Sequence, residues 1–268
     1  MIPASQIKLI HSLRQKKYRD RHRLFAVEGE KMVRELLGHN VTTGHRPQRL
    51  FATAGYIEAN KELLYSGGLD VTEVTEQELK KVSNLVTPQP VIALVSIPAP
   101  DPATEADYKG PVLAFESIRD PGNLGTILRT AGWFGISYVV CTPDSADLYN
   151  PKVVQATMGA LFRVKVTYLD LEEWFTRPDI ANRQILGTFL EGDNLYSVPL
   201  GKDPVILFGN ESKGLSDRYN RYIGRRISIP SFAGGGFGPE SLNVAAAVAV
   251  VCSELRRGNR VVPTQSGN

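Results

Sequence analysis

The sequence predicts an α/β protein in two parts, each with a β-sheet covered by helices. Its 268 residues exceed the commonest size of a single domain, and 42% of them are apolar, enough for sizeable hydrophobic cores. A stretch with Pro98, Pro100 and Pro102 among acidic and small residues has the composition of a linker. Beyond it, strand-like runs without strict alternation are separated by helical segments, which is typical of a parallel sheet covered on both faces. We therefore expect a first domain over 1–97, a linker over 98–110, a second domain over 111–258 and a disordered tail over 259–268.

The first part opens with an expected amphipathic helix. Ser5 is its expected N-cap, and apolar residues then recur at helical spacing as far as Leu13. Thr75 and Glu78 have the spacing of a capping box, so another helix is expected to begin at Glu76. The remaining pattern predicts strands at 24–27, 49–54, 71–74 and 91–96, and helices at 28–37, 57–64 and 76–82.

The second part repeats this alternation over a longer stretch. Short apolar runs bounded by glycine, proline or polar clusters mark its strands, and helical spacing marks its helices. The expected strands are 112–116, 138–141, 163–168, 184–189, 205–208 and 226–229, and the expected helices are 124–133, 151–156, 171–175 and 242–257.

Three loops of this second part share one polar chemistry. Asn123, Asn210 and Asn243 each stand beside glycine or serine, soon after a strand-like run. In α/β enzymes the carboxyl ends of the strands carry the ligand site. The sequence therefore predicts a functional site built by these three loops.

The same loops resemble the motifs of the SpoU (TrmH-type) RNA 2'-O-ribose methyltransferases. The family cores Asn-x-Gly-x-x-x-Arg, Gly-(Asn/Ala)-Glu-x-x-Gly and Ser-Leu-Asn occur in the family's order at 123–129, 209–214 and 241–243. A further match lies at 150–160. The glycine-rich residues 232–238 make the third connection longer than the family pattern leads us to expect.

The resemblance implies methyl transfer from S-adenosylmethionine to a ribose 2'-hydroxyl, without a metal ion. It also implies a C-terminal trefoil knot, which chain topology alone does not predict because knots are nearly absent among proteins, and a homodimer formed through the knotted domain. Ribosomal RNA of the 23S type is the expected substrate. A tRNA substrate, or a non-catalytic RNA-binding factor in ribosome assembly, stays open.

Carried over residue by residue, the family assigns roles to fourteen positions of this chain. The implied catalytic residues are Arg129, Asn123, Glu211, Asn243 and Ser241. The implied cofactor-binding residues are Thr188, Leu190, Phe208, Gly209, Asn210, Gly214, Ile229, Pro230 and Leu242.

Plain structural roles remain open for several of these residues. Asn123 and Asn243 have the chemistry of N-caps, and Glu211 suits the start of a helix. Because arginine is effectively always protonated, we expect Arg129 to clamp a phosphate or polarise the 2'-oxygen rather than act as a free base. We also expect a contact between Arg129 and Glu211 that fixes the guanidinium.

Positive charge is concentrated at the start of the chain. Residues 1–31 hold eight Lys or Arg against three acids, a local charge of +5 in a chain whose total is +3. Such asymmetry favours a polyanionic partner, although an exposed basic helix is as often only a solvated face. Residues 25–30 add a weaker resemblance to the L30e-like RNA-binding domains that precede many catalytic domains of the family. The expected RNA-binding residues are Arg14, Lys16, Lys17, Arg19, Arg21 and Arg23.

Several other classes of protein are disfavoured. The histidines all lie at or before His45, so a Ser-His-acid hydrolase or a His-ligated metal centre in the second part is not expected. Neither part has GxGxxG after its first strand, and 209–214 is followed by Leu-Ser rather than Lys-Ser/Thr, which argues against NAD and ATP.

The remaining composition favours a cytoplasmic protein. Cys141 and Cys252 each stand in an apolar run without a CxxC partner, and we expect both to be buried hydrophobic residues. The strongest apolar run, 244–252, is too short to span a bilayer, and the first ten residues lack a long apolar core.

Overall fold

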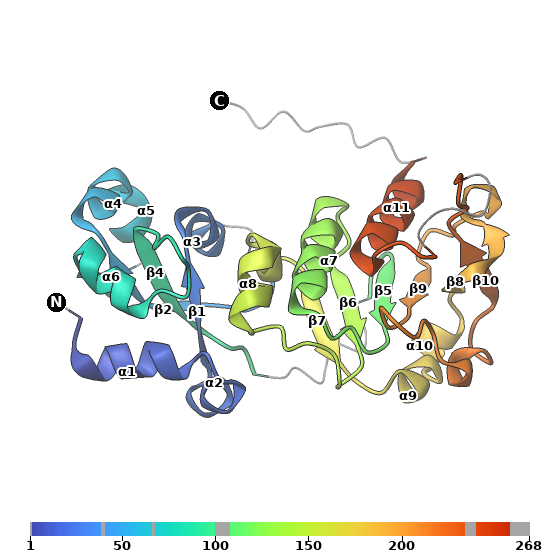
Figure 1. The fold of residues 1–268 in the computed structure, drawn as a ribbon, viewed down its shortest axis with the longest axis horizontal. Helices are drawn as coiled ribbons and strands as arrows, with labels where there is room; N and C mark the ends of the chain where they lie inside the picture. The colour runs from blue at the N-terminus through green and yellow to red at the C-terminus, as the bar shows by residue number, and fades with distance from the viewer. Residues whose placement is uncertain (1, 39–40, 66–67, 100–107, 234–239, 258–268) are drawn as a thin grey trace.

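Two β-sheets organise the chain, one toward each end of an elongated molecule (Figure 1). The structure is a computed structural model that describes residues 2–38, 41–65, 68–99, 108–233 and 240–257. The central part of the expected linker (100–107) and most of the glycine-rich connection (234–239) lie outside the described residues, as do Gly258 and the expected tail over 259–268.

The N-terminal sheet is mixed, with the strand order β1-β4-β2-β3. Strand β4 is antiparallel to both β1 and β2, whereas β3 is parallel to β2. Its strands are β1 (Leu24–Glu28), β2 (Pro47–Ala52), β3 (Val71–Glu73) and β4 (Val91–Ser96), and its helices are α1 (Ala4–Ser12), α2 (Lys16–His22), α3 (Glu30–Leu37), α4 (Ala54–Ala59), α5 (Lys61–Tyr65) and α6 (Glu76–Val82).

Local signals explain where these helices begin. The capping box is present: the Thr75 hydroxyl accepts from the Glu78 amide, and the Glu78 carboxylate accepts from the Thr75 amide. Ser5 is not an N-cap, because α1 already begins at Ala4 after Pro3. The side chain of Thr53 caps α4, which ends the preceding strand earlier than predicted.

The C-terminal sheet is entirely parallel, as predicted, with the order β10-β8-β9-β5-β6-β7. Its strands are β5 (Val112–Phe115), β6 (Tyr138–Cys141), β7 (Lys165–Tyr168), β8 (Ile185–Asn194), β9 (Val205–Phe208) and β10 (Arg225–Ser228). Its α-helices are α7 (Pro121–Trp133), α8 (Pro151–Thr157), α9 (Leu171–Phe175), α10 (Pro178–Ala181) and α11 (Val244–Arg256), and its 3-10 turns are η2 (Ala160–Phe162), η3 (Leu195–Ser197) and η4 (Asp217–Tyr219).

Helices cover both faces of this sheet, which explains its continuous apolar strands. In β5, Leu113 and Phe115 belong to the core beneath α7, α8 and α11, whereas Val112 and Ala114 belong to the core beneath α9 and α10. Both cysteines are buried and unpaired, as predicted, and burial raises the pKa of Cys141 and Cys252 to about 12. Figure 1 shows α8, α7 and α11 side by side.

Strand β8 is longer than predicted and irregular. Its pairing with β10 passes from Gly187 opposite Arg226 directly to Asp193 opposite Ile227. The residues between Gly187 and Asp193 therefore leave the regular ladder, as in a β-bulge, next to the predicted cofactor contacts Thr188 and Leu190. The strand order is compatible with the predicted knot without establishing it, and the knot stays a prediction.

No helix among the described residues is long and apolar enough to cross a membrane.

Candidate functional site

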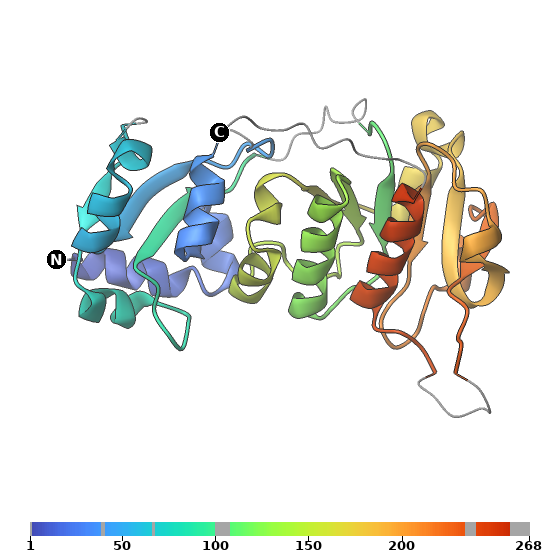
Figure 2. The same ribbon diagram turned by 90° about the horizontal axis from the view of Figure 1, so that it is seen from above.

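The three polar loops meet at one edge of the parallel sheet. The loop after β5, the loop after β9 and the segment before α11 all lie at the carboxyl ends of the strands, the lower edge in Figure 2. This edge is where the sequence places the site.

The loop after β5 frees the Asn123 side chain for other contacts. Asp120, not Asn123, is the N-cap of α7, and its Oδ1 accepts from the Asn123 backbone N–H at 2.8 Å. Pro121 occupies the first helical turn, where its missing N–H removes no helical bond. The amide of Asn123 consequently points to residues of the other two loops.

The loop after β9 is a tight turn that depends on two glycines. Asn210 and Gly214 exchange backbone hydrogen bonds of 3.0 and 2.9 Å. A Cβ on Gly209 would lie 2.1 Å from the Gly214 carbonyl carbon, and Gly214 has a φ of +68°. The Asn210 amide also donates to the Ser117 carbonyl at 2.7 Å, which ties this turn to the loop after β5.

A chain of side-chain hydrogen bonds connects all three loops. The Asn243 Nδ2 donates to Asn123 Oδ1 at 3.0 Å, and the Asn123 Nδ2 donates to Glu211 Oε1 at 3.2 Å. Glu211 also accepts from the Asp120 backbone N–H at 3.3 Å. Asn243 is at the same time the N-cap of α11 through its Oδ1. The capping role and the network role are thus combined in one residue.

Arg129 lies apart from this network. It is an exposed residue of α7, and no hydrogen bond or ion pair within the described parts of the chain joins it to Glu211. The expected Arg129–Glu211 contact is therefore wrong for this conformation. The reason is helical phase: six residues turn a helix by roughly 600°, which puts Arg129 about a third of a turn away from Asn123.

A cavity of about 930 Å³ opens beside the network. Its size is in the range of pockets that hold small molecules or cofactors. All nine predicted cofactor-binding residues line it, as do Glu211, Asn243 and Ser241, whereas Asn123 and Arg129 do not. The roles of these residues stay predictions.

Several exposed apolar side chains line this cavity. Leu190, Phe232 and Leu242 are 72%, 88% and 50% exposed, although all three line the same space. Exposed apolar groups gathered at one site are typical of a ligand-binding surface. Sequence reasoning missed several further lining residues, for which only proximity in sequence to predicted ones was a signal: Phe189, Glu191, Leu195, Arg226, Ser231 and Glu240.

A buried carboxylate supports the loop after β9, and the motifs gave no signal for it. Glu116 is 7% exposed and accepts from the Ser216 backbone N–H at 2.8 Å, the Ser216 hydroxyl at 2.5 Å and the Arg218 guanidinium at 3.1 Å. Burial, followed by the negative charge of Glu116, raises the pKa of Tyr219 to about 12. Glu116 thereby anchors the chain just after the Gly209–Gly214 turn.

The predicted RNA-binding residues fall into two groups. Arg14, Lys16, Lys17, Arg21 and Arg23 are exposed around α2. Arg19 is only 3% exposed and pairs with Asp147 of the second domain, so the prediction that it binds RNA from the surface is wrong. The sequence could not show this, because its partner is 128 residues away.

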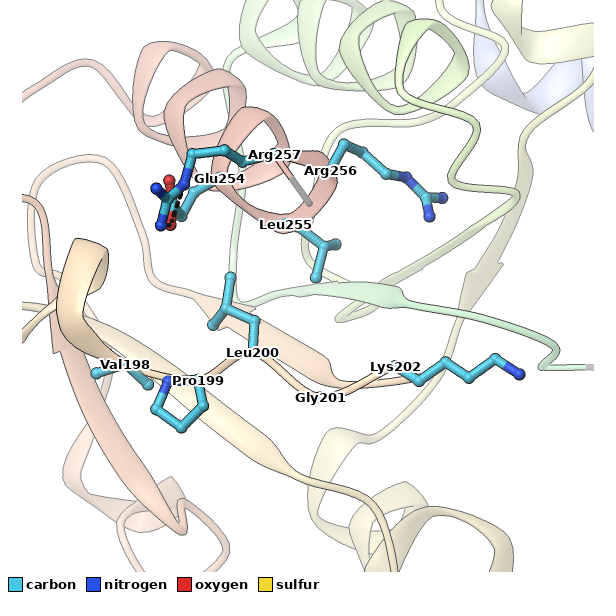
Figure 3. A pocket seen from close by; sticks show the side chains of 9 residues that line it. All are labelled: Val198, Pro199, Leu200, Gly201, Lys202, Glu254, Leu255, Arg256 and Arg257. Atoms are coloured by element: carbon cyan, nitrogen blue, oxygen red, sulfur yellow. Dashed lines mark hydrogen bonds and ion pairs between the residues drawn. The ribbon is translucent and has the colours of Figure 1, made fainter. Parts of the chain in front are cut away.

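A second, smaller cavity of about 480 Å³ lies at the carboxyl end of α11 (Figure 3). The charged ends of Arg256 and Lys202 point away from it, and the Arg256 guanidinium instead donates to the Phe134 and Gly135 carbonyls at 2.8 and 3.0 Å. It contains no predicted site residue. The part of the chain that the structure describes also holds no group of three or more His, Cys, Asp or Glu arranged for a metal ion.

Comparison with known proteins agrees with this geometry. Residues 110–253 match the SpoU rRNA Methylase family, and residues 4–93 match the MRM3-like substrate binding domain. The curated 23S rRNA (guanosine(2553)-2'-O)-methyltransferase RlmP of Bacillus subtilis is 28% identical over 245 residues, which covers 91% of this chain and 93% of the relative.

Solved structures extend the similarity to the whole chain. A putative RNA methyltransferase of the TrmH family from Porphyromonas gingivalis shares 39% identity with a TM-score of 0.83, covering 96% of this chain and 99% of the other. An AdoMet-bound rRNA methyltransferase from Sinorhizobium meliloti shares 29% identity with a TM-score of 0.82, covering 97% of each chain. With more than half of its length matched by one family and its three motif loops joined at one edge, the chain belongs to the SpoU rRNA methylase family.

Proposed function

We propose that this protein transfers a methyl group from S-adenosylmethionine to a ribose 2'-hydroxyl of ribosomal RNA of the 23S type. The observation that carries the proposal is the Asn243–Asn123–Glu211 network, which joins the three family motifs beside a cofactor-sized cavity. The named activity of the Bacillus relative over nearly its full length supports the choice of reaction and of RNA.

The cavity suits this cofactor. When bound, S-adenosylmethionine supplies an activated methyl group on a positively charged sulfur. Leu190, Ile229 and Leu242 line the cavity and would pack against the faces of its adenine ring. The backbone at Gly214 could approach the cofactor closely, because nothing lies within 4 Å of the position that a Cβ would take there. Glu211 lines the same cavity, and its carboxylate would favour the positive charge of the sulfonium.

The protein's own residues would position the RNA ribose. Asn123 and Asn243 hold each other and Glu211 in a fixed arrangement, so little reorganisation is needed when the substrate arrives. Arg129, exposed on α7 and free of any ion pair among the described residues, is available for a phosphate or for the negative charge that develops on the 2'-oxygen.

Methyl transfer can be measured with labelled S-adenosylmethionine. Ribosomal RNA and intact ribosomal subunits from cells that lack the gene are the substrates, and the RNA is then digested to nucleosides. We expect label in a 2'-O-methylnucleoside, about 100-fold less with Arg129→Ala, and partial activity with Arg129→Lys, which keeps the charge. Label in the tRNA fraction would redirect the substrate, and no label in any RNA would contradict the reaction.

We propose further that the protein is a homodimer through the faces of α7 and α11. Trp133 at the end of α7 is 85% exposed, and in α11, which packs on α7, Ala246 is exposed and Val250 is partly buried. Aromatic residues are enriched at protein–protein interfaces, and a symmetric dimer uses the same patch of both chains. Light scattering should give twice the mass of one chain, and Trp133→Glu should give a monomer. A monomeric wild type would contradict this arrangement.

A further inference from the structure

Arg19 occupies an unusual place among the basic residues of α2. Its neighbours Lys16, Lys17 and Arg21 are exposed, but Arg19 is 3% exposed. One guanidinium nitrogen donates to the carbonyls of Leu13 and Arg14 at 2.8 and 2.9 Å, so the side chain closes the turn between α1 and α2. A buried charge needs such partners, because leaving one without them is strongly destabilising.

The second terminal nitrogen of the guanidinium reaches the second domain. It pairs with Asp147, whose side chain is 22% exposed. Asp147 also accepts from the Tyr149 backbone N–H at 3.0 Å through its other oxygen, which fixes the carboxylate in the loop after β6. The basic helix is therefore bonded directly to this loop.

The loop after β6 is in turn bonded to the first motif loop. The Ala146 backbone N–H donates to the Ile118 carbonyl at 2.7 Å, and the Ile118 N–H donates to the Ser145 hydroxyl at 3.2 Å. Ser117, one residue earlier, accepts from the Asn210 amide at 2.7 Å. A short series of hydrogen bonds thus runs from Arg19 to the loops that carry Asn123 and Glu211.

The two domains have a second ion pair that lacks this connection. Glu35 of α3 pairs with Arg163, which follows the 3-10 turn η2 after α8. Within the described parts of the chain, neither of these side chains is hydrogen-bonded to the first motif loop. Among the described residues there are thus two interdomain ion pairs, and the loop of Asp147 alone is bonded to the edge that carries the motif loops. The effects of breaking each pair can therefore be compared directly.

We propose that Arg19, with Asp147, is a positioning pair that holds α2, the helix predicted to bind RNA, at a fixed distance from the edge that carries the motif loops. The inference rests on the proposed function for its RNA substrate. Its physical basis is that an RNA gripped by α2 can present its ribose correctly only if α2 and the motif loops move as one body. A misplacement of about 1 Å can reduce a rate by about 100-fold.

The test compares Asp147→Asn and Arg19→Lys with the matched control Glu35→Gln, all in the full-length protein. We expect Asp147→Asn to lower kcat for ribosomal RNA about 10- to 100-fold, with the Kd values for RNA and S-adenosylmethionine within about 3-fold of wild type. Arg19→Lys keeps the positive charge but loses the planar guanidinium, which bonds the α1–α2 turn and Asp147 at the same time. An intermediate kcat is therefore expected. Glu35→Gln should retain the wild-type kcat.

Hydrogen exchange provides a readout that does not depend on methyl transfer. We expect faster exchange of the Ile118 and Ala146 amides in Asp147→Asn and no such change in Glu35→Gln. Equal exchange and equal kcat in the two variants would overturn the proposal, and so would a loss confined to RNA affinity. If no RNA is methylated by the wild type, the proposed reaction fails, and the exchange pattern alone then decides whether the pair holds the motif loop.

Discussion

Asn123 and Asn243 are joined by a hydrogen bond of 3.0 Å across 120 residues of sequence. Each side-chain amide also makes a second hydrogen bond: Asn123 donates to Glu211, and Asn243 accepts from the first turn of α11 as its N-cap. The pair therefore couples the start of α7 to the start of α11, and with it the first motif to the third.

Replacing Asn123 with alanine should lower the catalytic rate without destabilising the fold. Asn123→Ala removes the acceptor of Asn243 and a donor to Glu211, while the cap of α7 by Asp120 is kept. We expect kcat for RNA to fall by about 10- to 100-fold, with the melting temperature nearly unchanged. Steady-state methylation and thermal unfolding measure the two effects, and a wild-type kcat would remove Asn123 from the catalytic arrangement.

The helices and strands could be predicted from the sequence where capping residues or hydrophobic periodicity determine them locally. The capping box at Thr75 and the strands 91–96, 138–141 and 205–208 lie where the sequence places them, because periodicity and capping chemistry act over a few residues. The long β8, by contrast, continues past its apolar part, where only pairing with β10 keeps it extended.

The sequence predicted which loops form the site, but it did not predict the contacts between their side chains. The residues that the motifs predict to bind the cofactor all line one cavity of the structure. The burial of Arg19 and of Glu116 depends on partners more than 90 residues away, Asp147 and Ser216, which no local pattern reveals. The Arg129–Glu211 contact failed for a different reason, because six residues of α7 turn Arg129 about a third of a turn away from Asn123.

Glu116→Gln should weaken both stability and cofactor binding. In Glu116, Oε1 accepts from the Ser216 hydroxyl and from Arg218, and Oε2 accepts from the Ser216 backbone N–H. A glutamine has one carbonyl oxygen, so its NH2 group must face the donor or donors on one of these two sides. We expect a loss of about 1–3 kcal/mol in the free energy of unfolding and a weaker Kd for S-adenosylmethionine by calorimetry. The control is Glu172→Gln, which breaks the exposed pair with Arg221 and should cost less than about 1 kcal/mol. Equal effects of the two variants would contradict a supporting role for Glu116.

Gly125→Ala should disturb the packing of α7 on α8. A Cβ at Gly125 would lie 2.4 Å from the Ala156 Cβ and 2.8 Å from the Val153 carbonyl oxygen. We expect a loss of about 1–3 kcal/mol of stability. Gly55 in α4 has nothing within 4 Å of such a Cβ, so Gly55→Ala should instead stabilise by about 0.4–1 kcal/mol. Urea unfolding of both variants measures the contrast, and a neutral Gly125→Ala would show that the helices can move apart freely.

The exposed basic residues of α2 should govern RNA affinity. Replacing Lys16, Lys17 and Arg21 together with alanine leaves the buried Arg19 in place. We expect weaker RNA binding and a slope of log K against log salt that is shallower by roughly 0.7–0.9 for each phosphate that the variant no longer neutralises, with unchanged affinity for S-adenosylmethionine. Lys61→Ala, an exposed lysine of α5 paired with Glu58, is the control. An unchanged salt slope in the triple variant would place the RNA elsewhere.

The imidazole of His45 should make the junction of the two domains sensitive to acid. His45 is only 5% exposed, and the rings of Phe25 and Phe162 pack against its imidazole. Its Nδ1 lies 2.6 Å from the Thr43 hydroxyl, and its Nε2 lies 3.2 Å from the Tyr149 hydroxyl. Burial lowers the pKa of His45 from 6.5 to about 4. Between these two values the unfolded chain binds a proton that the folded protein does not, so the free energy of unfolding falls as the pH falls. The full loss is on the order of 3 kcal/mol, reached as the pH drops through about 4.

The variant His45→Gln isolates this contribution, because glutamine can form hydrogen bonds but does not titrate. Urea unfolding of both proteins at pH 7.5, 6 and 5 should show a stability advantage of the wild type that is largest at pH 7.5 and shrinks toward pH 5. All other titrating groups are common to the two proteins and cancel in the difference. A difference that stays constant over this range would mean that His45 is protonated as readily in the folded protein as in the unfolded chain, and that the junction of the two domains admits its charge.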